Sequence, residues 1–131
     1  MIRPTQHDAY SGQSWGRKFQ VATRGVLLGF RKQSSFRVHL PIALAVTVVA
    51  GGLGVEIWQW CVLIGCIGGV LALELINTSL ESLSRAVTRE ENPWVRDALD
   101  LGSGAVLLGS VAASLIGLLA LLPNLLSLWE S

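Results

Sequence analysis

The sequence is poor in charge, because only 15% of its 131 residues are Asp, Glu, Lys or Arg. It holds two cysteines and two histidines, too few for a disulfide framework or for the usual Cys/His spacing of a zinc site. It has no Walker loop, no glycine-rich kinase loop and no Ser/His/Asp order typical of hydrolases. These absences exclude disulfide scaffolds, zinc modules and the common soluble nucleotide-binding folds.

Apolar residues are abundant instead, and they are arranged in long runs. The chain is 51% hydrophobic, with a mean hydropathy of +0.53. Runs of about 20 apolar residues are typical of membrane-spanning helices. Three such spans are predicted, at roughly 38–57, 59–83 and 101–122. The expected fold class is therefore an all-α integral membrane protein.

The residues before the first span divide into two parts. Residues 1–14 are polar and rich in Ser, Gln and Gly, so we expect a disordered tail. From Trp15 to about Lys32, aromatic residues recur at helical spacing beside basic ones, which predicts an amphipathic helix on the inner membrane surface. This helix either anchors the chain to anionic lipid or also supplies cations to a phosphate ligand. The membrane domain is then 15–122, followed by a short C-terminal tail, 123–131.

The basic residues are confined to one side of the predicted spans. Seven of the ten precede the first span, and the others lie between the second and third: Arg85, Arg89 and Arg96. The positive-inside rule then places the N-terminus and the 84–100 loop in the cytoplasm. Within this loop, Asn92-Pro93 is expected to end one helix and to begin the next, with Pro93 in its first turn.

The cysteines and histidines show no ligand pattern. Cys61 and Cys66 are five residues apart, on different faces of a helix, so we expect buried free thiols and neither a disulfide nor a metal pair. His7 and His39 are isolated in the sequence.

Small residues recur along two of the spans. Gly65 and Gly69 are four residues apart in the second span. In the third span, Gly109, Ala113 and Gly117 follow one another at the same four-residue spacing. Such faces permit close packing of membrane helices, either within one chain or between chains.

The second span carries the most informative polar residues. Glu74, Asn77 and Glu81 are spaced i, i+3, i+7, so a helix presents them on one face. Ionisable residues inside a membrane usually mark a functional site. The alternative is that the acids only extend to the nearby interface, but Glu74 is followed by Leu80 and Leu83, which places it within the apolar boundary.

This combination of residues fits phosphoryl transfer. The reaction needs a metal held by oxygens, cations on the phosphates and a base near the attacking hydroxyl. The carboxylates of Glu74 and Glu81 lie near arginines, and Asp100 begins the third span at the same interface. A proton-coupled carrier can use similar groups, but carriers usually have more spans and internal repeats, and no repeat is visible here.

The motif Glu-x-x-Asn-Thr-x-x-Glu at 74–81 is followed, after a short loop, by Ala-x-Asp-x-Gly-Ser-x-Ala-Val at 98–106. With the segment Phe36-Arg-Val-His-Leu40, these motifs resemble the prokaryotic diacylglycerol kinases and their undecaprenol kinase relatives over about residues 15–122. The resemblance implies a homotrimer of three-span subunits in the bacterial inner membrane. It also implies transfer of the ATP γ-phosphate to a lipid hydroxyl with Mg²⁺ as cofactor.

The resemblance also implies a role for individual residues. By position these are the catalytic base Glu74, the active-site amide Asn77, the metal ligand Glu81, the nucleotide-site acids Glu90 and Asp100, and the lipid-site serine Ser103.

Three positions depart from the family pattern. The second metal-binding glutamate is Gln33 here, the acid one turn after Glu81 is Arg85, and the lysine before the Asp100 position is Leu99. Gln33 still offers Mg²⁺ a neutral oxygen, and Arg96 or Arg85 can supply the missing cation. Two functions therefore stay open: a lipid kinase acting on diacylglycerol or a polyprenol, or a catalytically altered kinase-fold protein that binds lipid or a partner membrane protein.

Overall fold

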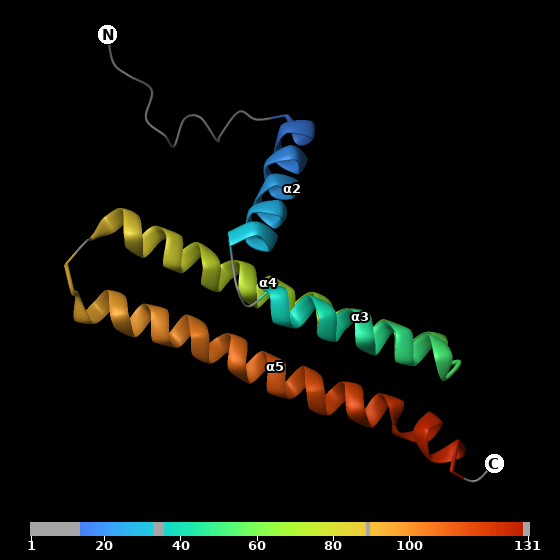
Figure 1. The fold of residues 1–131 in the computed structure, drawn as a ribbon. Helices are drawn as coiled ribbons and strands as arrows, with labels where there is room; N and C mark the ends of the chain where they lie inside the picture. Colours follow the sequence, from blue (N-terminus) through green and yellow to red (C-terminus); the bar gives the residue numbers. More distant parts are fainter. Residues whose placement is uncertain (1–13, 33–35, 89, 130–131) are drawn as a thin grey trace. The chain divides into compact units, whose positions relative to one another are not determined.

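The computed structural model describes residues 14–32, 36–88 and 90–129. Its elements, in chain order, are the helices α2 (Trp15–Lys32), α3 (Phe36–Gly52), α4 (Ile57–Val87) and α5 (Pro93–Ser127) (Figure 1). The chain divides after Lys32 into two compact units, one with α2 and the other with α3, α4 and α5. The all-α prediction is confirmed for the described residues, whereas Gln33 and the predicted tail up to residue 13 lie outside them.

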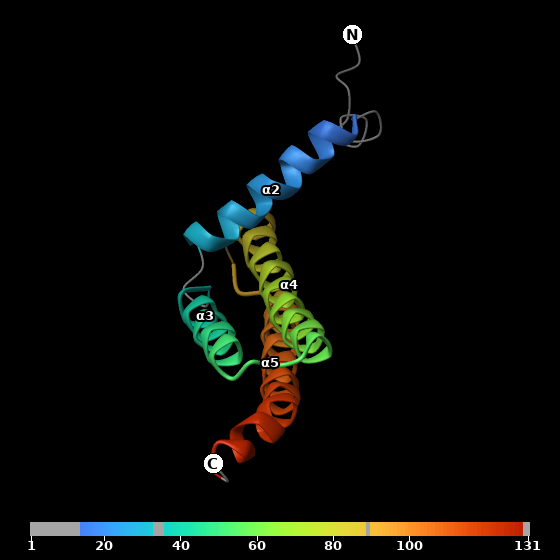
Figure 2. The same ribbon diagram turned by 90° about the vertical axis from the view of Figure 1, so that its right-hand side faces the viewer.

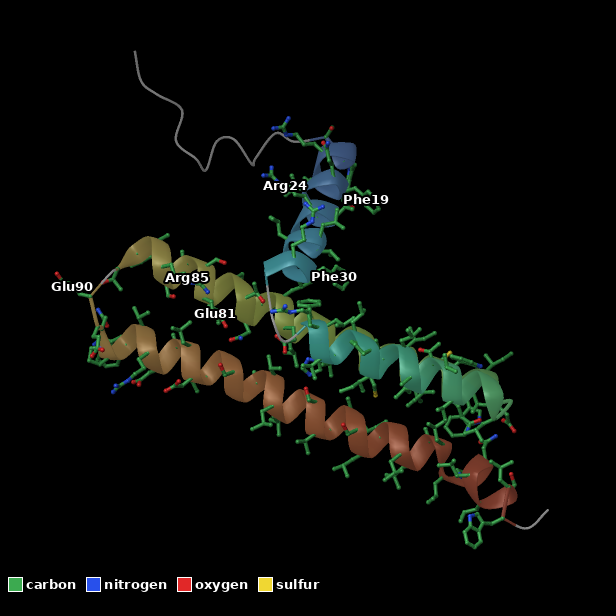
Figure 3. All side chains as sticks on the ribbon, viewed as in Figure 1. Phe19, Arg24, Phe30, Glu81, Arg85 and Glu90 are labelled. Atoms are coloured by element: carbon green, nitrogen blue, oxygen red, sulfur yellow. The ribbon has the colours of Figure 1, made fainter. Side chains whose placement is uncertain are left out.

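Helix α2 has the bounds that the sequence predicts. Its apolar side chains are exposed within the chain, with Trp15 at 85% and Phe19 at 77%. Phe19 and Arg24 point to different sides of the helix (Figure 3). A helix over these residues is thus confirmed, and its role as an amphipathic helix on a membrane surface stays a prediction.

Helix α3 is shorter than the predicted first span. It ends at Gly52 rather than near 57, because the chain turns at Gly54, which has a φ of 62°. This left-handed conformation is one that glycine adopts without steric cost. At 17 residues, α3 is about 25 Å long, somewhat less than the ~30 Å of a bilayer core.

Helices α4 and α5 are long and apolar enough to cross a membrane, and up to three such crossings can be drawn in the described residues. Helix α4 begins with a capping box, in which the Glu56 N–H donates to Gln59 Oε1 at 2.7 Å. Helix α5 begins as predicted: Asn92 Oδ1 accepts from the backbone N–H of Trp94 at 3.0 Å, and Pro93 is at the first helical position.

Helices α4 and α5 lie side by side and antiparallel (Figures 1 and 2). The glycines of α5 lie against α4: a Cβ on Gly109 would collide with Leu73, and one on Gly117 would touch Leu63 at 3.6 Å. Within a membrane, close van der Waals packing of this kind holds helices together. The small residues of the third span therefore serve packing within one chain, which decides the alternative that the sequence leaves open for this helix.

One side of α4 is not covered by α3 or α5. Gly65 and Gly69 are exposed, with no atom within 4 Å of an added Cβ. Cys61 is also exposed and Cys66 is half-buried, both as free thiols. The prediction of buried cysteines is therefore wrong for this chain alone, because the rotation of α4 about its axis is set by the glycines of α5 and not by the cysteines.

The end of α5 is held by side chains of neighbouring elements. The predicted third span stops before Pro123, but α5 continues to Ser127, although proline removes one helix hydrogen bond. In this turn, Gln59 Nε2 donates to the carbonyl of Ala120 at 2.5 Å and to Asn124 Oδ1 at 2.7 Å. Asn124 Nδ2 in turn donates to the Leu53 carbonyl at 3.4 Å. These bonds join α4 and the α3–α4 turn to α5.

We expect Gln59→Ala and Asn124→Ala to lower stability in a coupled way. Hydrogen bonds between membrane helices contribute about 1 kcal/mol each, and residues that share a bond give non-additive losses. Thermal unfolding in detergent, followed by circular dichroism, should show the double variant losing less than the sum of the single variants. Ser114→Ala is the control, because its hydroxyl bonds only within α5. Additive losses would contradict the assignment.

Candidate functional site

The acidic face of α4 forms as the sequence predicts, with burial that decreases along it. The side chain of Glu74 is 2% exposed, whereas that of Glu81 is 30% exposed. Asn77 lies between them and is buried. The alternative in which the acids only extend to the interface is thus wrong for Glu74. Glu81 and Arg85 lie on the stretch of α4 nearest the α4–α5 turn, which holds Glu90 (Figure 3).

Glu74 is contacted by a residue that the sequence leaves isolated. Its Oε1 lies 3.3 Å from His39 Nδ1, and His39 Nε2 lies 3.3 Å from Ser110 Oγ. His39, which is isolated in the sequence, thus gains both of these contacts from the tertiary fold. A signal was available, because a histidine in an apolar run falls under the same rule that singles out Glu74.

Asn77 bonds to the Glu81 carboxylate and lies against α5. Its Nδ2 donates to Glu81 Oε1 at 3.3 Å. Its Oδ1 faces Gly102, where an added Cβ would lie only 2.6 Å away. Glycine at position 102 therefore permits the close approach of α5 to the amide.

Two buried acceptor atoms of this face have no hydrogen-bond donor in the described part of the chain: Glu74 Oε2 and Asn77 Oδ1. A buried unsatisfied acceptor costs about 1–3 kcal/mol, and such atoms in a native fold call for an explanation. A ligand that brings a hydroxyl or another N–H or O–H group would satisfy them. The acidic face is thus arranged to receive a hydrogen-bond donor.

A pocket of about 500 Å³ is formed by the last turn of α4, the α4–α5 turn and the start of α5. Arg85, Glu90 and Arg96 line it together with Leu99. The structure thus brings together Glu90 and Arg96, which are both expected to bind the nucleotide. Arg85 Nη2 also lies 3.2 Å from Glu81 Oε2. Arg85 is mostly exposed in this pair, so the pair is weakly held and the guanidinium can be exchanged for a phosphate contact.

Asp100 and Ser103 are exposed on α5 and are not among the residues that line this pocket. The Ser103 hydroxyl donates to the Leu99 carbonyl of its own helix at 3.0 Å. A single chain therefore does not bring Asp100 and Ser103 together with Glu90 and Glu74.

The described residues offer limited ligands for a metal ion. Within 14–32, 36–88 and 90–129, no group of three or more His, Cys, Asp or Glu side chains is arranged to hold one. Mg²⁺, however, often binds one or two carboxylates together with substrate phosphates and water. Glu81 fits that mode, because it is half-exposed beside the pocket that Arg85 lines.

A second cavity, of about 400 Å³, lies between α3, α4 and α5. Its lining is mostly aliphatic and includes Val46 and Leu63, with His39, Ser110 and Ser114 as polar groups. Ligand cavities of this size typically combine apolar walls with a few polar groups that fix orientation. This cavity can accept an apolar chain whose polar end lies near His39.

Comparison with known proteins agrees with the geometry. Residues 20–121 match the family model described as prokaryotic diacylglycerol kinase. An undecaprenol kinase of Bacillus subtilis is 33% identical over 109 residues, which cover 83% of this chain and 89% of that protein. A diacylglycerol kinase of Synechocystis is 39% identical over 111 residues, which cover 84% of this chain and 63% of that protein. The chain belongs to the prokaryotic diacylglycerol kinase family.

Proposed function

We propose that this protein is a membrane lipid kinase that transfers the γ-phosphate of ATP to the hydroxyl of a diacylglycerol or a polyprenol such as undecaprenol. The observation that carries the proposal is the buried Glu74 carboxylate, whose Oε2 has no donor in the described residues. Its partner His39 lines the apolar cavity. The family and the names of both relatives, which are lipid kinases, support the same class of reaction.

Glu74 acts as the general base. The O–H bond of the lipid breaks, and its proton goes to Glu74 Oε2 as the hydroxyl oxygen attacks the γ-phosphorus. The new O–P bond replaces the bond to ADP, which leaves with the electron pair. Asn77 holds the Glu81 carboxylate through its Nδ2. This bond fixes the position of that carboxylate on the helix that also carries Glu74. Such positioning is the main contribution of protein to phosphoryl transfer.

The nucleotide belongs in the pocket at the α4–α5 turn, with Glu90 and Arg96 of one chain and Asp100 of a neighbouring subunit as its binding residues. Glu81, with the neutral oxygen of Gln33, is proposed as the Mg²⁺ ligand. The ion, when bound, reduces the negative charge of the phosphates. Arg96 and Arg85 supply the cations that Leu99 does not.

The complete site belongs to a homotrimer. Asp100 and the proposed lipid-site residue Ser103 are exposed on α5 and do not line the pocket at the α4–α5 turn of their own chain. A neighbouring subunit can use them to complete its site. The exposed side of α4, with Gly65 and Gly69, offers close packing to that neighbour.

A second function is favoured by one observation. Arg85 pairs with Glu81, and Leu99 lines the pocket where a phosphate would need a cation. A chain with this site occupied by its own arginine could instead be a catalytically altered kinase-fold protein that binds lipid or a partner membrane protein. The assay below separates the two.

Purified protein with radiolabelled ATP should phosphorylate at least one member of a panel of diacylglycerols and polyprenols. Glu74→Gln keeps the shape of the side chain but removes the base, so we expect turnover to fall by about 10²–10⁴-fold with nucleotide affinity nearly unchanged. Glu56→Gln, on the exposed outer turn, is the control. Equal rates for wild type and Glu74→Gln would refute the base, and no product with any nucleotide donor would favour the second function.

Two glycine variants test whether the position of Asn77 matters. Gly102→Ala places a Cβ 2.6 Å from Asn77 Oδ1, whereas the same change at Gly104 meets no atom within 4 Å. A displacement of about 1 Å near reacting groups can cost about 10²-fold. We expect Gly102→Ala to lower kcat by about 10–100-fold and Gly104→Ala to leave it unchanged. Equal kcat values for the two variants would show that Asn77 is not constrained by α5.

We further propose that the protein lies in the bacterial inner membrane with its N-terminus in the cytoplasm. In this proposal α3 also crosses the membrane, as the first of three spans. The one-sided basic residues support this orientation.

Single cysteines at Trp58 and Glu91, in a chain without Cys61 and Cys66, test the orientation. Both positions are exposed. A membrane-impermeant thiol reagent should modify the cysteine at 58 in intact spheroplasts, and the cysteine at 91 only after permeabilisation. Protection of the cysteine at 58 in intact spheroplasts would reverse the proposed orientation.

A further inference from the structure

Three polar side chains, one from each helix of the α3–α5 unit, contact one another in a row. Glu74 Oε1 of α4 contacts His39 Nδ1 of α3 at 3.3 Å, and His39 Nε2 contacts Ser110 Oγ of α5 at 3.3 Å. His39 and Ser110 line the aliphatic cavity, whereas Glu74 is 2% exposed. These contacts thus connect the buried carboxylate to a cavity that can accept an apolar ligand.

The chemistry of the partners determines where the protons are. A carboxylate oxygen in its ionised form only accepts hydrogen bonds, so Nδ1 of His39 must carry the hydrogen that lies toward Glu74 Oε1. Nε2 then accepts from the Ser110 hydroxyl when the ring is neutral, or donates to it when the ring is protonated. In both states the two contacts set the orientation of the ring, since each ring nitrogen has its own partner.

The same contacts distinguish the two oxygens of Glu74. Oε1 is engaged by His39, whereas Oε2 is buried without a donor in the described residues. In the proposed reaction, the incoming hydroxyl meets Oε2, while the contact with His39 keeps Oε1 in place. In many enzymes a second group likewise orients a catalytic side chain by contacting one of its atoms.

A nucleophilic serine is the competing interpretation, because a carboxylate, an imidazole and a hydroxyl also form the catalytic triad of hydrolases. That chemistry needs free N–H donors beside the serine to stabilise an oxyanion. Ser110 lies in the middle of the uninterrupted helix α5, Pro93–Ser127, where the backbone N–H groups are used by the helix itself. Ser110 is therefore better suited to hold His39 than to attack a substrate.

We propose that His39 is a positioning residue for Glu74, and that Ser110 holds the His39 ring at its second nitrogen. This inference rests on the proposed function, in which Glu74 is the base. It assigns to α3 a direct part in catalysis, because His39 determines which oxygen of the base faces the lipid hydroxyl.

Three variants of His39 separate its two contacts. His39→Ala removes both, His39→Asn retains an amide N–H near the position of Nδ1, and His39→Gln retains one near that of Nε2. We expect His39→Ala to lower kcat by about 10–100-fold without changing the KM for ATP. His39→Asn should restore most of the rate, and His39→Gln should not. Equal kcat values in wild type and His39→Ala would overturn the proposal.

A double variant distinguishes positioning from a structural role. In the Glu74→Gln background the base is already absent, so adding His39→Ala should cause no further loss of kcat, whereas a structural defect would lower it again. Ser110→Ala should cost less than His39→Ala. Thr47→Ala should cost nothing, because the Thr47 hydroxyl is exposed and donates to the Ala43 carbonyl of its own helix. A further loss in the double variant would refute positioning. Should Glu74→Gln itself keep the wild-type rate, the proposed function fails first, and the two failures are thus distinguishable.

Discussion

The structure depends on the burial of one carboxylate. Glu74 is 2% exposed within a unit of three apolar helices, and a charged or polar group in such surroundings is costly unless it is paired. His39 supplies one partner from α3, and the close approach of α5 at Gly102 closes the space beside Asn77. The remaining acceptor, Oε2, gives the site its capacity for a ligand that donates a hydrogen bond.

The two ends of the α4–α5 pair differ in how their polar groups are satisfied. At the end beside the α3–α4 turn, Gln59 and Asn124 bond to each other and to backbone carbonyls, so this end contributes to stability. Toward the α4–α5 turn, Glu74 and Asn77 each keep a buried acceptor without a donor in the described residues. The groups that join the helices and the groups proposed for catalysis thus lie apart along one helix pair, since satisfied networks rigidify a fold and unsatisfied groups can bind a ligand.

The departures from the family pattern change the charge of the site but keep its acidic face. Arg85 lies against Glu81, and the pair is exposed enough to be weakly held. Glu90 and Arg96 line the pocket at the α4–α5 turn, which keeps a cation near the place proposed for phosphate. The retained face and the rearranged cations are therefore compatible with a lipid kinase whose phosphate contacts differ from those of its relatives.

The sequence by itself determined what depends on local spacing. The bounds of α2, the start of α5 at Asn92-Pro93 and the shared face of Glu74, Asn77 and Glu81 follow from helical periodicity and capping. The tertiary structure alone decided the pairing of His39 with Glu74 and the exposure of the cysteines. These depend on how each helix is rotated about its axis. A helix that is apolar all round carries little record of that rotation in its sequence, so it emerges only when the glycines of α5 meet α4.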